Sequence, residues 1–178
     1  ATAIEKGADA IMLSGETAIG KHPDVAVSWL RRVIERTEGY VNFPRVEPSD
    51  DSPIYLKFNR SIISMAEYMD AKIVAYTTGG FTAMMLSRFR TKCHIIVASN
   101  NIKTIRQLKI VWGVNPQYIN KKDVTLDDLS SMVREKRLAT NGDLLVLTLG
   151  WRPELGNIQE IRVEEFRDVD SESIGASS

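Results

Sequence analysis

The chain has 178 residues, enough for one complete domain and part of a second, and its 43% hydrophobic and 26% charged residues are ordinary for a globular protein. Its 23 basic and 23 acidic side chains cancel, so the overall charge favours neither nucleic acid nor an anionic membrane as a partner. No apolar run is long enough to span a membrane and no signal peptide opens the chain, which predicts a cytoplasmic protein. The single cysteine, Cys93, excludes disulfides within the chain.

The first part of the chain predicts a short strand between two helices. A helix at residues 2–6 comes first, and an apolar strand follows at residues 9–13. In residues 22–39 the apolar side chains recur at spacings of three and four, Pro23 suits the first helical turn, and Gly39 suits the position just past the end. The strand has no neighbouring strand in this part of the chain, so its backbone donors and acceptors need partners from elsewhere.

Beyond residue 54 short apolar runs alternate with amphipathic ones. Four runs are apolar on both faces, which is typical of buried parallel strands. They are residues 73–76, 94–98, 116–119 and 144–147. The amphipathic runs predict helices at residues 55–69, 82–89, 102–111 and 126–138. The last run, residues 158–166, alternates imperfectly between apolar and polar residues and follows the fourth strand too closely for a helical crossover, which predicts an antiparallel strand.

This order of elements predicts an α/β fold with a mostly parallel five-stranded sheet and helices on both faces. The sheet and its helices occupy residues 55–167. Residues 43–54 are the predicted linker, because three prolines among acidic and hydroxyl residues disfavour both helix and sheet. Residues 168–178 are acidic and rich in serine, which predicts a disordered tail.

Residues 12–21 read Met-Leu-Ser-Gly-Glu-Thr-Ala-Ile-Gly-Lys and join the first predicted strand to the helix after it. Together with the strand before them and the helix opening near residues 21–23, they resemble the closing strand and loop of the pyruvate kinase barrel. A barrel of this kind has eight parallel strands. The resemblance therefore implies that residues 1–42 are the C-terminal end of a TIM-barrel catalytic domain whose other part is missing. It also implies that residues 55–167 are the C-terminal regulatory domain.

Ser14 and Glu16 are the candidate catalytic residues. They follow the carboxyl end of a barrel strand, where TIM barrels place their chemistry. In the family this stretch borders the active site, where a hydroxyl or carboxylate could deliver the proton that turns enolpyruvate into pyruvate. The alternative is that Glu16 and Thr17 only shape the loop and cap the helix.

The loop after the first strand of the sheet is the first candidate site for an anion. It contains Thr77, Thr78, Gly79, Gly80, Phe81 and Thr82. Hydroxyls and glycines directly before a helix let backbone amides converge on a phosphate, although they also cap helices and make turns with no ligand. In pyruvate kinases the corresponding loop holds the phosphate of an allosteric sugar phosphate, so the resemblance favours binding. Gly79 and Phe81 stand where many members carry a hydroxyl and a charged side chain, which leaves the effector's identity open.

The loop after the fourth strand of the sheet is the second candidate. It places Trp151 and Arg152 side by side between glycines, and a guanidinium suits a phosphate. The alternative is a hairpin in which Trp151 packs on the sheet edge and Arg152 pairs with a surface carboxylate. The Gly-Trp-Arg-Pro sequence resembles the effector loop of the family. Both loops leave the same edge of the sheet, so together they predict a site for a sugar phosphate or AMP.

The resemblance also carries expectations for the complete protein. It implies a cytoplasmic homotetramer that transfers a phosphoryl group from phosphoenolpyruvate to ADP and gives pyruvate and ATP. Mg²⁺ and K⁺ would be held by residues outside this chain, which would mainly carry effector binding and subunit contacts. Two alternatives stay open: a free-standing, non-catalytic α/β module that binds a phosphorylated metabolite, and a domain that serves only in assembly.

Overall fold

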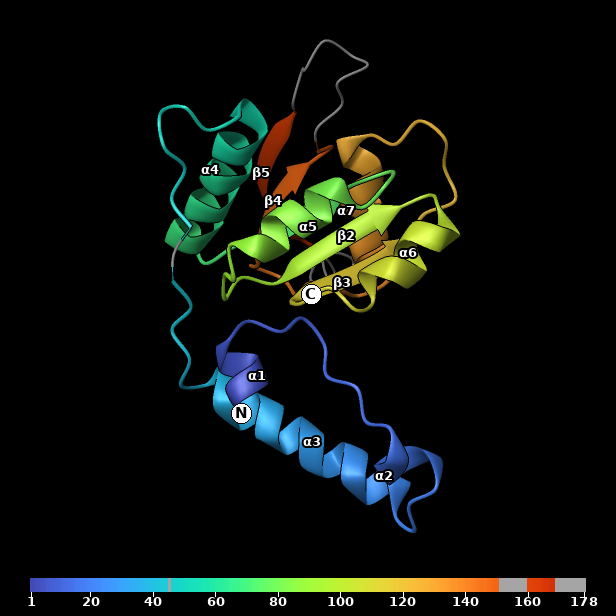
Figure 1. Cartoon of the computed structure of the whole chain (residues 1–178). Helices are drawn as coiled ribbons and strands as arrows, with labels where there is room; N and C mark the ends of the chain where they lie inside the picture. Colours follow the sequence, from blue (N-terminus) through green and yellow to red (C-terminus); the bar gives the residue numbers. More distant parts are fainter. Residues whose placement is uncertain (45, 151–159, 169–178) are drawn as a thin grey trace, which may run out of the picture. The chain divides into compact units, whose positions relative to one another are not determined.

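The computed structural model describes residues 1–44, 46–150 and 160–168 (Figure 1). Its contacts divide the chain into two units, Ala1–Arg45 with Ile110–Trp112, and Val46–Lys109 with Gly113–Ser178. The tail predicted from residue 168 onward lies, except for its first residue, outside the described residues.

The first unit contains three helices, α1 (Thr2–Glu5), α2 (Gly15–Ala18) and α3 (Pro23–Glu38). α3 confirms the long helix predicted here, with Pro23 in its first turn and Gly39 at its C-cap. Its apolar stripe is only partly covered by the described residues, since Val25 is 50% exposed and Trp29 60% exposed. A helix of this kind is stabilised mainly by burying its apolar face, so covering this stripe would stabilise α3 further.

The strand predicted at residues 9–13 does not form. A strand needs a hydrogen-bonded ladder with a neighbour, and this segment has none among the described residues. The loop predicted to follow it contains one helical turn, α2, in which Ala18 N donates to Ser14 O at 2.9 Å. Apolar composition alone was therefore not sufficient to define a strand here.

The second unit is built on a five-stranded sheet in the order β3-β2-β1-β4-β5. The strands are β1 (Lys72–Tyr76), β2 (Ile95–Ser99), β3 (Val114–Tyr118), β4 (Leu144–Thr148) and β5 (Ile161–Glu165). β1 to β4 are parallel to one another, and β5 pairs antiparallel with β4, as predicted. β1, β2 and β4 are buried along nearly their whole length, which explains why their sequences are apolar on both faces.

Helices cover both faces of this sheet (Figure 1). They are α4 (Ile54–Met69), α5 (Phe81–Arg88), α6 (Ile102–Leu108) and α7 (Leu126–Glu135). α7 packs on one face, where Leu129 and Val133 join Val74, Ile96 and Leu147 in one buried cluster. α5 and α6 lie on the opposite face, in front of the sheet in Figure 1. This arrangement confirms the predicted α/β fold.

Two of these helices end three residues earlier than predicted. α7 stops at Glu135, and Arg137 shortly after it has a φ of 51°, which a right-handed helix cannot contain. α6 stops at Leu108, just before the segment Ile110–Trp112 that belongs to the first unit.

Within the described ranges, none of the helices combines the length and the apolar character that crossing a membrane requires.

The winding direction of the sheet reverses between β1 and β4. From β1 the chain moves to β2 and β3 on one side, and it then returns to β4 on the other side of β1. The loops that leave the carboxyl ends of β1 and β4 therefore flank a topological switch point. Open α/β sheets bind their ligands at such points.

Candidate functional site

The loop between β1 and α5 presents backbone donors at this switch point. Thr78 and Gly79 are exposed, whereas Thr77 is buried and its Oγ1 accepts a hydrogen bond from Gly80 N at 3.0 Å. Gly80 precedes α5 with a φ of 91°, a conformation that favours glycine. Gly80 has no side chain, and no described side chain caps α5, so within the described part of the chain its first amides are available to another acceptor.

The end of β4 lies directly against this loop. Thr148 Oγ1 accepts a hydrogen bond from Gly150 N at 3.2 Å. A Cβ atom built on Gly150 would meet Thr82 Oγ1 at 2.5 Å and a backbone oxygen of β1 at 2.6 Å. Gly150, the last described residue before the second predicted loop, therefore contacts the first residues of α5 and the end of β1. Trp151 and Arg152 lie outside the described residues, and their roles stay predictions.

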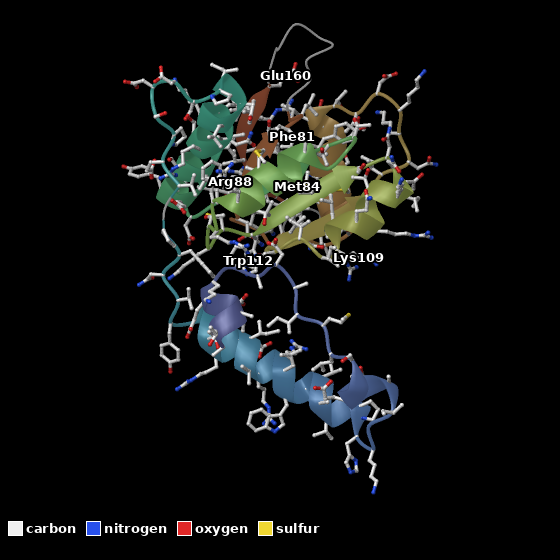
Figure 2. The ribbon with its side chains drawn as sticks, viewed as in Figure 1. Phe81, Met84, Arg88, Lys109, Trp112 and Glu160 are labelled. Atoms are coloured by element: carbon white, nitrogen blue, oxygen red, sulfur yellow. The ribbon has the colours of Figure 1, made fainter. Side chains whose placement is uncertain are left out.

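An aromatic pair adjoins the same loop. The rings of Phe81 and Tyr55 meet edge to face, with centroids 5.2 Å apart. Phe81 is 39% exposed at the start of α5, and Figure 2 shows Met84 and Arg88 farther along the same helix. Residues 77–82 contain no lysine or arginine. This loop therefore offers amides, hydroxyls and an aromatic ring to a ligand rather than cationic side chains.

Two hydroxyls that the sequence did not connect with this loop support it from neighbouring elements. Thr104 Oγ1, in α6, donates to Thr78 O at 2.8 Å, and Ser99 Oγ, at the end of β2, donates to the same oxygen at 3.5 Å. Both residues are buried. The carboxyl ends of β1 and β2 are adjacent in the parallel sheet, so the strand order is the signal that could have identified these residues.

Ser14 and Glu16 lie together at the start of α2 in the first unit. Ser14 N donates to Glu16 Oε2 at 3.2 Å. Hydrogen bonds from the amides of Glu16 itself and of Ser14 hold the pKa of the Glu16 carboxyl below its usual value. Both side chains are exposed. These contacts account for the shape of the turn, and the catalytic role of the two residues stays a prediction.

Metal ligands are not grouped in the part of the chain that the structure describes: it contains no cluster of three or more His, Cys, Asp or Glu side chains that could hold an ion. The described residues therefore do not fit a Mg²⁺ site of the kind used in phosphoryl transfer, which needs several carboxylate ligands. No chemical step through either predicted cation follows from these residues.

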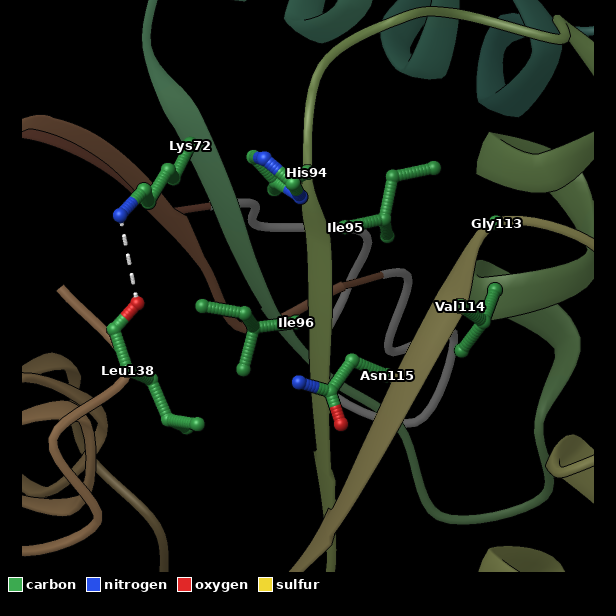
Figure 3. Close-up of a pocket in the computed structure, with 8 residues that line it drawn as sticks. All are labelled: Lys72, His94, Ile95, Ile96, Gly113, Val114, Asn115 and Leu138. Atoms are coloured by element: carbon green, nitrogen blue, oxygen red, sulfur yellow. Dashed lines mark hydrogen bonds between the residues drawn. The ribbon is translucent and has the colours of Figure 1, made fainter. Parts of the chain in front are cut away.

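A cavity of about 260 Å³ lies at the opposite edge of the sheet, at the amino ends of β1, β2 and β3 (Figure 3). Its polar groups come from Lys72, His94 and Asn115. Lys72 Nζ donates to Leu138 O at 3.4 Å, and it forms an ion pair with Asp143 Oδ2 at 2.6 Å. The lysine charge is thus already balanced, which makes this cavity a poorer anion site than the switch point.

Together these features define an α/β domain with a glycine- and threonine-rich loop at its switch point. A family model described as the alpha/beta domain of pyruvate kinase matches residues 59–163. Pyruvate kinase 2 of Synechocystis sp. is 32% identical over 180 residues, which cover 98% of this chain and 30% of the relative. A pyruvate kinase of Thermotoga maritima is 34% identical over 167 residues, which cover 92% of this chain and 36% of the relative. The chain belongs to the pyruvate kinase family.

Solved structures agree with this assignment. The crystal structure of a pyruvate kinase from Pyrobaculum aerophilum matches with a TM-score of 0.73 and 26% identity, over 92% of this chain and 34% of that chain. A pyruvate kinase from Cryptosporidium parvum matches with a TM-score of 0.76 and 26% identity, over 91% of this chain and 34% of that chain. The chain thus spans about a third of the length of the relatives it matches.

Proposed function

We propose that this chain is the C-terminal part of a pyruvate kinase and that its second unit binds a phosphorylated effector, a sugar phosphate or AMP. In this proposal residues 1–42 end the TIM-barrel domain, residues 43–54 are the linker, and residues 55–167 are the regulatory domain. The family membership supports the first part of the proposal. The geometry of the switch point supports the second.

The observation that carries effector binding is the contact between the two loops at the switch point. Gly150 at the end of β4 packs against Thr82 at the start of α5, at the carboxyl edge where open α/β sheets bind ligands. The uncapped amides of α5 favour a phosphate because they are donors at the positive end of the helix dipole.

Each group of the site has a role in this proposal. The amides of Gly79 and of the first turn of α5 bind phosphate oxygens, and the hydroxyls of Thr77, Thr78 and Thr82 shape the loop or add donors. Arg152 supplies the one cation, and Trp151 closes the site from the other loop. The ring of Phe81 adjoins the non-phosphate part of the ligand. A loop without a cation of its own suits a ligand with one phosphate better than one with two.

The complete enzyme, in this proposal, transfers a phosphoryl group from phosphoenolpyruvate to ADP as a cytoplasmic homotetramer. Its Mg²⁺ and K⁺ are held by residues outside this chain and supply charge stabilisation to the transferred group. Ser14 and Glu16 border the active site, where one of them takes part in delivering the proton to enolpyruvate.

Isothermal titration of the chain with inorganic phosphate, AMP and a panel of sugar monophosphates tests effector binding. We expect at least one of these ligands to bind and Arg152→Ala to weaken it about tenfold to a hundredfold, because a charge-assisted hydrogen bond contributes roughly 1.5 to 3 kcal/mol. Thr82→Ala should also weaken binding. Arg31→Ala, which removes an exposed arginine of α3, is the matched control and should bind as the wild type does. Absence of heat with every ligand contradicts the proposal.

A further inference from the structure

The peptide between Thr78 and Gly79 is held from its buried side. The Thr78 carbonyl oxygen accepts the hydroxyl of Thr104 at 2.8 Å and, more weakly, that of Ser99 at 3.5 Å. Thr104 is 3% exposed and Ser99 is fully buried. Two protein hydroxyls on one carbonyl oxygen fix the direction in which that oxygen points, toward α6 and β2.

The direction of this carbonyl also fixes the direction of the next amide. A trans peptide is planar, so the C=O of Thr78 and the N–H of Gly79 point in opposite directions. The N–H of Gly79 therefore points away from α6, toward the open side of the loop. Gly79 is exposed, and a Cβ built on it would meet nothing within 4 Å. No described residue accepts a hydrogen bond from this amide.

Because residue 79 is a glycine, the orientation of the Thr78–Gly79 peptide can easily be reversed. Residue 79 can change the sign of φ at little cost, so the peptide before it can rotate as a unit if nothing holds it. After such a rotation the carbonyl oxygen of Thr78 would point toward the open side, where it would repel an anion instead of binding it. A loop that binds phosphate through its amides therefore needs a restraint on this peptide.

We propose that Thr104 is the positioning residue that holds the Thr78–Gly79 peptide in the orientation that binds an anion. The inference rests on the proposed effector site and extends it to a residue of α6. Thr104 is itself fixed, because the side chain of Asn101 caps the helix and accepts from the amides of Lys103 and Thr104 at 2.9 and 3.5 Å. Its methyl group also adjoins Gly80: a Cβ on that glycine would lie 3.6 Å from Thr104 Cγ2.

Titration of the chain with inorganic phosphate and with AMP tests this role in four proteins: the wild type, Thr104→Val, Thr104→Ser and Thr91→Val. Valine keeps the shape of threonine but cannot donate, so Thr104→Val should weaken binding about tenfold. Serine restores the hydroxyl and should restore affinity. Thr91→Val removes another buried hydroxyl, which donates to Glu67 Oε1 at 3.0 Å, and should leave affinity unchanged. The amide signal of Gly79 in a ¹H–¹⁵N spectrum should shift with phosphate in the wild type and much less in Thr104→Val.

The outcomes distinguish a failure of the role of Thr104 from a failure of the proposed effector site. If the wild type binds neither ligand, the effector site itself is wrong and this inference falls with it. If the wild type binds and Thr104→Val binds equally well, the effector site stands and the role of Thr104 is wrong. Weak binding by Thr104→Ser, or equally weak binding by Thr91→Val, would also overturn the inference, because the loss would then not depend on this hydroxyl.

Discussion

Asp143 accepts three hydrogen bonds at the turn before β4. Its Oδ2 lies 2.6 Å from Lys72 Nζ, 2.6 Å from Thr140 N and 3.0 Å from Thr140 Oγ1. The hydrogen bond from Lys72 has the largest effect, and together these contacts lower the pKa of Asp143 from its ordinary value of 3.8 to about 2. Because the pKa is lower in the folded than in the unfolded state, the carboxylate stabilises the fold above about pH 4. This contribution is lost as the pH falls from about 4 to about 2.

We therefore expect Asp143→Asn to lower the free energy of unfolding by about 1 kcal/mol at neutral pH, a modest effect because the ion pair is partly exposed. The difference from the wild type should shrink as the pH is lowered through the window of about 4 to 2. Urea unfolding followed by circular dichroism at several pH values measures both effects. Asp51→Asn, in the linker, is the control for the loss of an exposed carboxylate. A difference that does not change with pH contradicts the role of the charge.

Individual site residues could be predicted from the sequence by their type and by their place next to a strand end. Thr77, Gly80 and Thr82 could be predicted as site residues because a parallel strand followed by glycines and hydroxyls is a local pattern. Thr104 was not, because its link to Thr78 spans 26 residues and exists only through the pairing of β1 with β2. A hydroxyl within a helix has no local signal that distinguishes a structural from a positioning role.

Among the secondary-structure elements of the site, the end of β4 is constrained both by its backbone conformation and by its close packing. Gly150 has a φ of 71°, and it approaches Thr82 and β1 so closely that a Cβ has no room. Strain at a positive φ costs about 1 kcal/mol or more for a residue other than glycine, and the clash adds to it. Gly150 therefore limits how closely the end of β4 can approach Thr82 and β1 once a side chain is present.

Gly150→Ala should thus lower the unfolding free energy by more than Gly142→Ala and should weaken phosphate binding. Gly142 is the matched control, since it has a φ of 88° but nothing lies within 4 Å of a Cβ built there. Both variants introduce backbone strain of about 1 kcal/mol, so the difference between them reports the contact with the other loop. Chemical denaturation and phosphate titration measure the two effects. Equal losses in the two variants would mean that the contact at Gly150 contributes nothing.

The elements themselves could be predicted where local sequence and tertiary context agree. β1, β2 and β4 are apolar on both faces because helices cover both sides of the sheet, and the sequence therefore revealed them. Residues 10–13 are also apolar, but the segment 9–13 pairs with no described strand and forms none. The helix ends were less predictable, as the left-handed Arg137 illustrates, since apolar spacing does not report a single residue with a positive φ.

The chain combines a five-stranded sheet domain with a first unit whose described residues form little core. Met12 is 86% exposed and Trp29 is 60% exposed, and the described residues contain no grouping of metal ligands. In-line phosphoryl transfer needs metal ions and cations placed around the transferred group. The chain spans about 30% of one related enzyme and 36% of another.

We therefore expect the purified chain of 178 residues to form no pyruvate from phosphoenolpyruvate and ADP, with Mg²⁺ and K⁺ supplied. A lactate dehydrogenase-coupled assay measures this, and a complete pyruvate kinase assayed in parallel is the positive control. Turnover by this chain that depends on both substrates would contradict the assignment of catalysis to residues outside it.

In the proposed function, the loops at the β1 and β4 ends of the sheet form one phosphate-binding site. Mapping of ¹H–¹⁵N amide shifts during titration of the chain with inorganic phosphate locates this site residue by residue. We expect the largest and saturable shifts at Gly79, at the first amides of α5 and at Gly150. Shifts concentrated at the opposite edge, around Lys72 and His94, or no saturable shift at the switch point would contradict the claim.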